Sequence, residues 1–264
     1  MSREKRLVTD LIQRALFIAL AVYVGLGLFL YFGQSAFIYY PTPDISVDGV
    51  STIRVKNSDV TLKIHVVNPG RSSAVLYFGG NAEAVVRNAP VFSRLFNDHT
   101  LYLMNYRGYG GSEGRPTEYA LYDDALKLFD QVAPLHEHLS VIGRSLGSGI
   151  ATYLAAERDF RKLILVTPFD SLERLASSHY PVYPMSLMLR ETYNSLGRVP
   201  HIREQTLILV AADDRIVMPS HAHELAAAFP AGQATIVVLP DTGHNSISFS
   251  DRYYPAIQEF LGID

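Results

Sequence analysis

A serine in a glycine-rich turn is the residue of this chain with the clearest features of a nucleophile. Ser145 follows an apolar run at residues 139–142 and precedes a helix-like run at residues 150–158. This pattern predicts a strand, a sharp turn and a helix, with the serine hydroxyl at the apex of the turn. Gly143 and Gly147 flank the serine because a Cβ at either position would collide with the adjoining strand or helix. A plain tight connection is the alternative interpretation.

A serine hydroxyl becomes a good nucleophile only when a neighbouring base takes its proton and an acid orients that base. His244 follows the last apolar run of the chain, and Asp213 and Asp214 follow the run before it. The order Ser145, Asp, His244 is the one that α/β-hydrolases use. We favour Asp214 as the acid because its spacing to Val217 fits a D-x-x-V pattern, and Asp213 is the alternative.

Two further glycines predict an oxyanion-binding loop. Gly79 and Gly80 follow the apolar run at residues 74–78 and allow the backbone to approach a substrate closely. We expect the amide of Asn81 to donate to an oxyanion beside the amide of Leu146, the residue that follows the serine. A glycine turn without a catalytic part is the alternative.

Residues 105–112 form another glycine-rich segment at the end of a predicted strand. The segment lacks the G-K-[ST] ending of a phosphate-binding loop, so we interpret it as a turn in the pocket wall that contributes Arg107 and Tyr109. The side chain of Arg107 could steer an acidic substrate, or it could form a structural ion pair.

The elements that must position these residues alternate along the chain. Short apolar runs predict buried strands, and helix-like segments separate them, which is typical of a mostly parallel sheet with helices on both faces. We therefore predict an α/β class protein with the α/β-hydrolase fold, beginning with a strand hairpin at residues 51–67. The later strands are expected at residues 74–78, 101–104, 139–142, 163–166, 207–211 and 235–239.

An apolar insertion interrupts this pattern at about residues 168–200. It contains Tyr180, Pro181, Tyr183 and Pro184. It is expected either to cover the active site as a short lid, which would suit acyl or aryl substrates, or to pack as two short helices on the domain.

The N-terminal segment has the pattern of a membrane anchor. Basic residues precede residues 15–32, which carry no charge and would span roughly 27 Å as a helix. We predict a cytoplasmic tail and a single transmembrane helix at residues 1–35 and a catalytic domain at residues 36–264. The positive charges predict a cytoplasmic N-terminus with the domain on the far side, periplasmic if the source is bacterial. A cleaved signal peptide is the alternative.

Composition excludes several other classes of function. The chain has 264 residues, a formal net charge of −3 and no cysteine. The charge gives no reason to expect nucleic acid as a partner, and the absence of cysteine excludes disulfides and thiolate chemistry. His221 and His223 lie on different faces of a predicted helix, so we expect no metal site.

Together these motifs make the chain resemble the membrane-tethered BEM-type α/β-hydrolases, which are serine hydrolases with one N-terminal span. The resemblance covers nearly the whole chain after residue 39. It rests on the runs at residues 39–43, 77–82, 105–110, 143–149, 167–171 and 243–245. One departure is that the family usually has His-Gly-Asn-Ala where this chain has Gly79 to Ala82. The resemblance implies hydrolysis of esters, thioesters or occasionally amides, without a metal or cofactor.

The sequence thus predicts a hydrolase that cleaves carboxylic esters or thioesters through Ser145, His244 and Asp214, by way of an acyl-enzyme. The expected substrate is a small or lipid-like acyl ester, and the oligomeric state is left open. A serine peptidase or amidase on the same fold is the first alternative. A catalytically inactive binding protein anchored in a membrane is the second.

Overall fold

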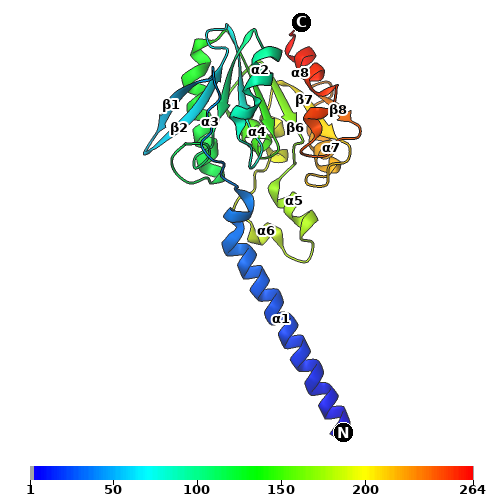
Figure 1. The fold of residues 1–264 in the computed structure, drawn as a ribbon. Coiled ribbons are helices and arrows are strands. Elements are labelled where there is room, and N and C mark those ends of the chain that lie inside the picture. Colours follow the sequence, from blue (N-terminus) through cyan, green and yellow to red (C-terminus); the bar gives the residue numbers. More distant parts are fainter. Residues whose placement is uncertain (1–2, 264) are drawn as a thin grey trace.

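The computed structural model describes residues 3–263, and its centre is an eight-stranded sheet with the strand order β1-β2-β4-β3-β5-β6-β7-β8 (Figure 1). The strands are β1 (Ser51–Asn57), β2 (Val60–Val67), β3 (Ser73–Phe78), β4 (His99–Met104), β5 (His138–Arg144), β6 (Lys162–Val166), β7 (Gln205–Ala211) and β8 (Ala234–Leu239). β2 pairs antiparallel with β1 and β4, and the other pairs are parallel. The predicted fold class and its mostly parallel sheet are confirmed.

Helices cover both faces of this sheet because the parallel strands are apolar on both sides. Leu76 and Val141 pack into one core with α3 (Glu118–Val132), α4 (Leu146–Glu157) and α7 (Pro219–Ala228). Val75 and Ile142, their neighbours along the strands, pack into a second core with α2 (Ala89–Leu95) and α8 (Tyr253–Leu261). Short 3-10 turns complete the domain: η1 (Val85–Asn88), η2 (Ala133–Leu135), η3 (Leu196–His201) and η4 (Ile247–Phe249).

The N-terminal segment is one long helix, α1 (Arg3–Ile38), which projects away from the domain as a rod (Figure 1). Its stretch Leu7–Ile38 is long and apolar enough to cross a membrane. Large apolar side chains on it, such as Leu16 and Phe17, are exposed. The helix ends just after the domain boundary predicted at residue 35.

The insertion at residues 168–200 contains two short helices, α5 (Leu172–His179) and α6 (Met185–Met188), which lie beside the end of α1 nearest the domain (Figure 1). The amide side chain of Gln34 on α1 donates to the carbonyl of Met188 and accepts from the amide of Arg190. The insertion therefore packs as two short helices. Leu172 and Leu175 of α5 pack against the domain core, so the insertion contacts both the domain and α1.

Candidate active site

Ser145 occupies a strained turn between β5 and α4. Its backbone has φ 50° and ψ −116°, which places a non-glycine residue at positive φ. A Cβ on Gly143 would lie 2.4 Å from the carbonyl oxygen of Gly147, and a Cβ on Gly147 would lie 2.0 Å from that of Phe78. Both distances are far below van der Waals contact, so the turn cannot form in this way without glycine at these two positions.

A hydrogen-bonded chain joins the serine to a histidine and an aspartate. The Nε2 atom of His244 lies 2.8 Å from the Ser145 hydroxyl, and Nδ1 lies 2.7 Å from Oδ2 of Asp214. The other oxygen of Asp214 accepts the amides of Ile216 and Val217, each at 2.9 Å. These two bonds orient the carboxylate, and with a proton on Nδ1 the imidazole can accept the proton of the serine hydroxyl.

The structure distinguishes between Asp213 and Asp214, the two candidates for the acid that orients His244. The Asp214 carboxylate is buried against His244, whereas Asp213 is exposed and its amide donates to the carbonyl of Thr242. The backbone therefore directs Asp214 rather than Asp213 toward the histidine. The turn from Asp214 to Val217 is the D-x-x-V segment of the sequence.

The loop after β3 passes close to the serine. A Cβ on Gly80 would lie 3.6 Å from the Cβ of Ser145. Within residues 3–263, the backbone amides of Asn81 and Leu146 have no hydrogen-bond partner. Both amides are thus unpaired within the described residues, and Asn81 lines the cleft together with Ser145.

The side chain of Asn81 has a separate role that the sequence did not indicate. Its Nδ2 donates to the carbonyl of Ile38 at 2.7 Å, and its Oδ1 accepts from the amide of Tyr40 and the hydroxyl of Tyr109, both at 2.9 Å. The Tyr109 hydroxyl also accepts from the Tyr40 amide at 2.8 Å. Burial raises the pKa of Tyr109, which keeps this hydroxyl protonated as a donor. These bonds fasten the loop to the end of α1.

Arg107 forms a structural ion pair and does not line the cleft. Its guanidinium donates from Nε and Nη2 to the fully buried carboxylate of Asp124, at 2.6 and 2.5 Å. Of the two roles considered for Arg107, the ion pair is the one that the structure shows. Tyr109 supports the loop from behind and is also absent from the described lining of the cleft, so the pocket-wall interpretation of these two residues was wrong.

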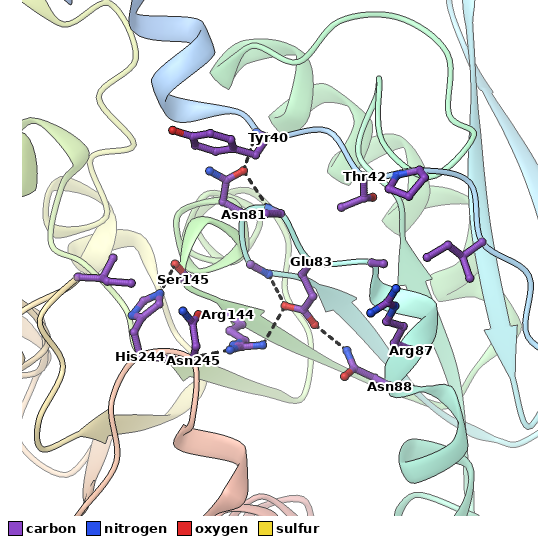
Figure 2. Close-up of a pocket in the computed structure, with 16 residues that line it drawn as sticks. Tyr40, Thr42, Asn81, Glu83, Arg87, Asn88, Arg144, Ser145, His244 and Asn245 are labelled. Atoms are coloured by element: carbon purple, nitrogen blue, oxygen red, sulfur yellow. Dashed lines mark hydrogen bonds and ion pairs between the residues drawn. The ribbon is translucent and has the colours of Figure 1, made fainter.

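Sequence reasoning missed Glu83, a nearly buried acid that lies between the glycine loop and β5 (Figure 2). Its carboxylate accepts from the Gly80 amide at 2.7 Å, the Tyr77 hydroxyl at 2.7 Å and the Asn88 side chain at 2.6 Å. It also pairs with Arg144 at 3.2 Å. An acid three residues after a glycine pair carries no motif, so nothing in the sequence distinguished it from an ordinary turn residue.

Arg144, the residue before the serine, links this acid to the histidine loop. Its Nη1 pairs with Glu83 and its Nη2 donates to the carbonyl of His244 at 3.4 Å (Figure 2). Burial would lower the pKa of Arg144, but the attraction of Glu83 and of nearby tyrosines outweighs it, so the pKa is raised. A charged Arg144 therefore connects the loop around Gly80 to the loop around His244.

Ser145 and His244 open into a cleft of about 680 Å³ (Figure 2). One wall comes from the segment that follows α1 and includes Tyr40, Thr42, Pro43 and Ile45. Within the described residues, no member of the segment 168–200 lines this cleft. The expectation that the insertion forms a lid is therefore replaced by a wall built from residues 40–45.

No cluster of metal-binding side chains is present among residues 3–263. His221 instead bonds through Nδ1 to Asp170 at 2.8 Å, and His223 is exposed. Asp170 is buried, which would raise its pKa, but the hydrogen bonds from His221 and the Ser171 amide outweigh burial and lower it.

Comparison with known proteins identifies the fold of this chain. Residues 74–187 match the family model of the alpha/beta hydrolase fold. A Pyrococcus furiosus esterase, Pf2001, superposes with a TM-score of 0.67 over 84% of this chain and 98% of its own, at 16% identity. A hydrolase from Pseudomonas aeruginosa gives a TM-score of 0.63 over 82% of this chain and 100% of its own, at 18% identity. The protein is therefore an alpha/beta hydrolase in fold.

Three curated proteins are similar to this chain in sequence. The Mycobacterium tuberculosis protein Rv2307c is 29% identical over 90% of both chains. The Saccharomyces cerevisiae membrane protein YNL320W is 29% identical over 78% of this chain and 73% of its own. Bem46 of Schizosaccharomyces pombe is 26% identical over 90% of this chain and 88% of its own. BEM46-type alpha/beta hydrolases are thus among the homologues of this protein, as the sequence motifs indicated.

Proposed function

We propose that this protein is a serine hydrolase that cleaves carboxylic esters or thioesters by transferring the acyl group to water. The observation that carries the proposal is the hydrogen-bonded chain from Asp214 through His244 to Ser145, which ends in an open cleft. A buried carboxylate, an imidazole and a hydroxyl in this order supply the acid, base and nucleophile that acyl transfer requires.

In the first step His244 takes the hydroxyl proton as Ser145 attacks the substrate carbonyl. The negative charge that develops on the carbonyl oxygen is stabilised by the amides of Leu146 and Asn81, an effect of about 3 kcal/mol per donor in comparable sites. Asp214 stabilises the imidazolium that forms. His244 then gives its proton to the leaving alcohol or thiol, and an acyl-enzyme remains.

In the second step a water molecule replaces the leaving group. His244 takes a proton from water as the water oxygen attacks the acyl carbonyl, and the same two amides receive the second oxyanion. Return of the proton to the Ser145 oxygen breaks the acyl bond. The carboxylic acid leaves and the free serine is regenerated.

The protein acts at a membrane surface in this proposal. Helix α1 is long and apolar enough to span a bilayer, and one homologue, YNL320W, is named as a membrane protein. The basic residues at the start of the chain favour a cytoplasmic N-terminus, with residues 36–264 on the far side. A small or lipid-like acyl ester fits the cleft, which carries both apolar and polar side chains.

Labelling of the full-length protein with a fluorophosphonate tests the nucleophile. We expect the wild type to label, Ser145→Ala to lose the label, and Ser72→Ala, at an exposed serine remote from the cleft, to keep it. Hydrolysis of matched p-nitrophenyl esters, thioesters and anilides then compares the substrate classes. Equal labelling of Ser145→Ala and wild type, or no labelling of a folded wild type, would contradict the proposal.

A further inference from the structure

The segment between α5 and η3 carries an exposed apolar tip that the hydrolytic site does not use. Residues 180–189 include no charged side chain. Leu187 and Val182 are 82% and 69% exposed, and Tyr180 is 47% exposed. Apolar side chains grouped in this way on one short segment mark a surface that contacts something other than water.

The tip is fixed against the apolar part of α1. The rings of Tyr23 and Tyr183 stack with their centroids 4.7 Å apart. The Tyr23 hydroxyl donates to the carbonyl of Val182 at 2.8 Å, and the Tyr183 hydroxyl donates to that of Tyr23 at 3.1 Å. A Cβ on Gly27 would lie 3.2 Å from the Tyr183 ring. The tip therefore lies at the level of Tyr23 and Gly27, inside the uncharged stretch 15–32.

The first charged residue after the tip, Arg190, contacts α1 at a point nearer to the domain. The guanidinium of Arg190 stands 4.8 Å over the ring of Tyr31 and donates to the Tyr31 carbonyl at 3.1 Å. Tyrosine and arginine at the end of an apolar stretch are typical of a membrane–water interface. From Tyr31 down to Tyr23 is about 12 Å of helix, close to half of the hydrocarbon thickness.

Most of the backbone of the tip is paired within the protein. Five of its eight amides, those of Tyr180, Tyr183, Met185, Leu187 and Leu189, donate to backbone carbonyls. Pro181 and Pro184 have no amide hydrogen to satisfy. In lipid, unpaired backbone groups cost several kcal/mol each, so this pairing lowers the cost of placing the turn there.

From these observations we infer that residues 180–189 enter the lipid bilayer beside α1, as a second membrane-embedded element. The inference depends on the proposed anchoring of α1, because the contact with Tyr23 sets the depth of the tip. The partner of this surface is the acyl region of one leaflet. The domain would then contact the membrane through both α1 and the tip, which border the apolar groove between α1 and α5. Two such contacts hold the catalytic domain in one orientation.

The chain contains no tryptophan, so a single introduced tryptophan reports on one site. We would make Leu187→Trp and Val182→Trp in the full-length protein, both at exposed positions, and reconstitute each in phosphatidylcholine vesicles with brominated acyl chains. Phe17→Trp on α1 is the lipid-exposed control, and Phe249→Trp, 83% exposed on the domain, is the water-exposed control.

We expect the tip variants to show blue-shifted emission and at least half of the quenching seen at position 17, with no quenching at position 249. If the tip variants behave like Phe249→Trp while Phe17→Trp is quenched, the tip stays in water and only the anchor stands. A blue shift without quenching would mean that protein covers the tip, which also overturns the inference. If position 17 is not quenched, the anchor proposal fails, and this inference fails with it.

Discussion

Glu83→Gln should slow the reaction although Glu83 touches neither the substrate carbonyl nor Ser145. The carboxylate holds the Gly80 amide, one residue before the Asn81 amide that we propose as an oxyanion donor. It also neutralises Arg144, whose other nitrogen reaches the His244 carbonyl. Glutamine keeps the shape of the side chain but loses its charge and turns an NH2 group toward groups that also donate.

The size of the effect follows from the contacts. Glu83 is 13% exposed and Arg144 is 18% exposed, so the substitution leaves a largely buried guanidinium without its anion. Breaking one side of such a pair costs about 3–5 kcal/mol, and we expect the lower end, since both groups retain some solvent. A loss of about 3 kcal/mol corresponds to a fall in Tm of about 6–12 °C for a domain of this size.

The kinetic effect should fall mainly on kcat. A loosened oxyanion loop weakens an interaction made only in the transition state, and loss of a whole donor costs roughly 100-fold or more. Because the Asn81 amide is displaced but not removed, we expect kcat to fall roughly 10- to 100-fold with little change in KM. Hydrolysis of a p-nitrophenyl ester and thermal unfolding of the same preparation measure the two effects.

Two variants make this reasoning refutable. Glu113→Gln is the matched control, because Glu113 is exposed and its carboxylate accepts only from the Thr61 amide among the described residues. The double variant Glu83→Gln/Arg144→Met removes both charges and should be more stable than the sum of the single losses. Wild-type kcat and Tm for Glu83→Gln, or strictly additive losses in the double variant, would show that the bridge does not position the loop.

Three further outcomes are expected. Asp214→Asn should lower kcat by about 10⁴ because the amide favours the wrong tautomer of His244, whereas Asp213→Asn should stay near wild type in the same ester assay. Gly147→Ala should fail to label with a fluorophosphonate and should melt earlier, because its Cβ would lie 2.0 Å from a backbone carbonyl oxygen. The lowered pKa of Asp170 stabilises the fold above its unfolded pKa of about 3.9, and this contribution is lost as pH falls through the folded pKa. Asp170→Asn, which also weakens the bond to His221, should therefore cost stability at neutral pH and progressively less below pH 4, measured by thermal unfolding.

The sheet and the serine turn could be predicted because both depend on residues that are close together in the sequence. Parallel strands are continuous apolar runs, and each run was found within a residue or two of its strand. The prediction that every one of them is buried was wrong for β8, which lies at the sheet edge and exposes Ile236 and Val238. The glycines at 143 and 147 are required by contacts within one turn and its neighbouring strand. The choice of Asp214 was possible for the same reason, since its partners are the amides two and three residues later.

The features that could not be predicted from the sequence depend on contacts between segments far apart in the chain. The insertion was expected either over the active site or on the domain. The structure packs α5 on the domain and the tip at residues 180–189 beside α1, which was not expected. Its apolar composition fits either position, and contacts with a distant segment, such as the stacking of Tyr183 on Tyr23, decide between them. Glu83 and Arg144 are separated by 61 residues and become partners only when β3 and β5 pair in the sheet.

The helix that leaves the domain is also part of how the site is built. The carbonyl of Ile38 and the amide of Tyr40 both bond to the Asn81 side chain, and the next residues form one wall of the cleft. The Tyr39 hydroxyl, between them, bonds to Glu191 and Tyr193 at the end of the insertion. A fragment that begins at residue 46 would thus lose a cleft wall and two partners of Asn81, and one that begins at residue 36 keeps both. The side of the domain from which α1 leaves and the loop after β3 are held by the same few residues, so the position of α1 and the geometry of the site are coupled.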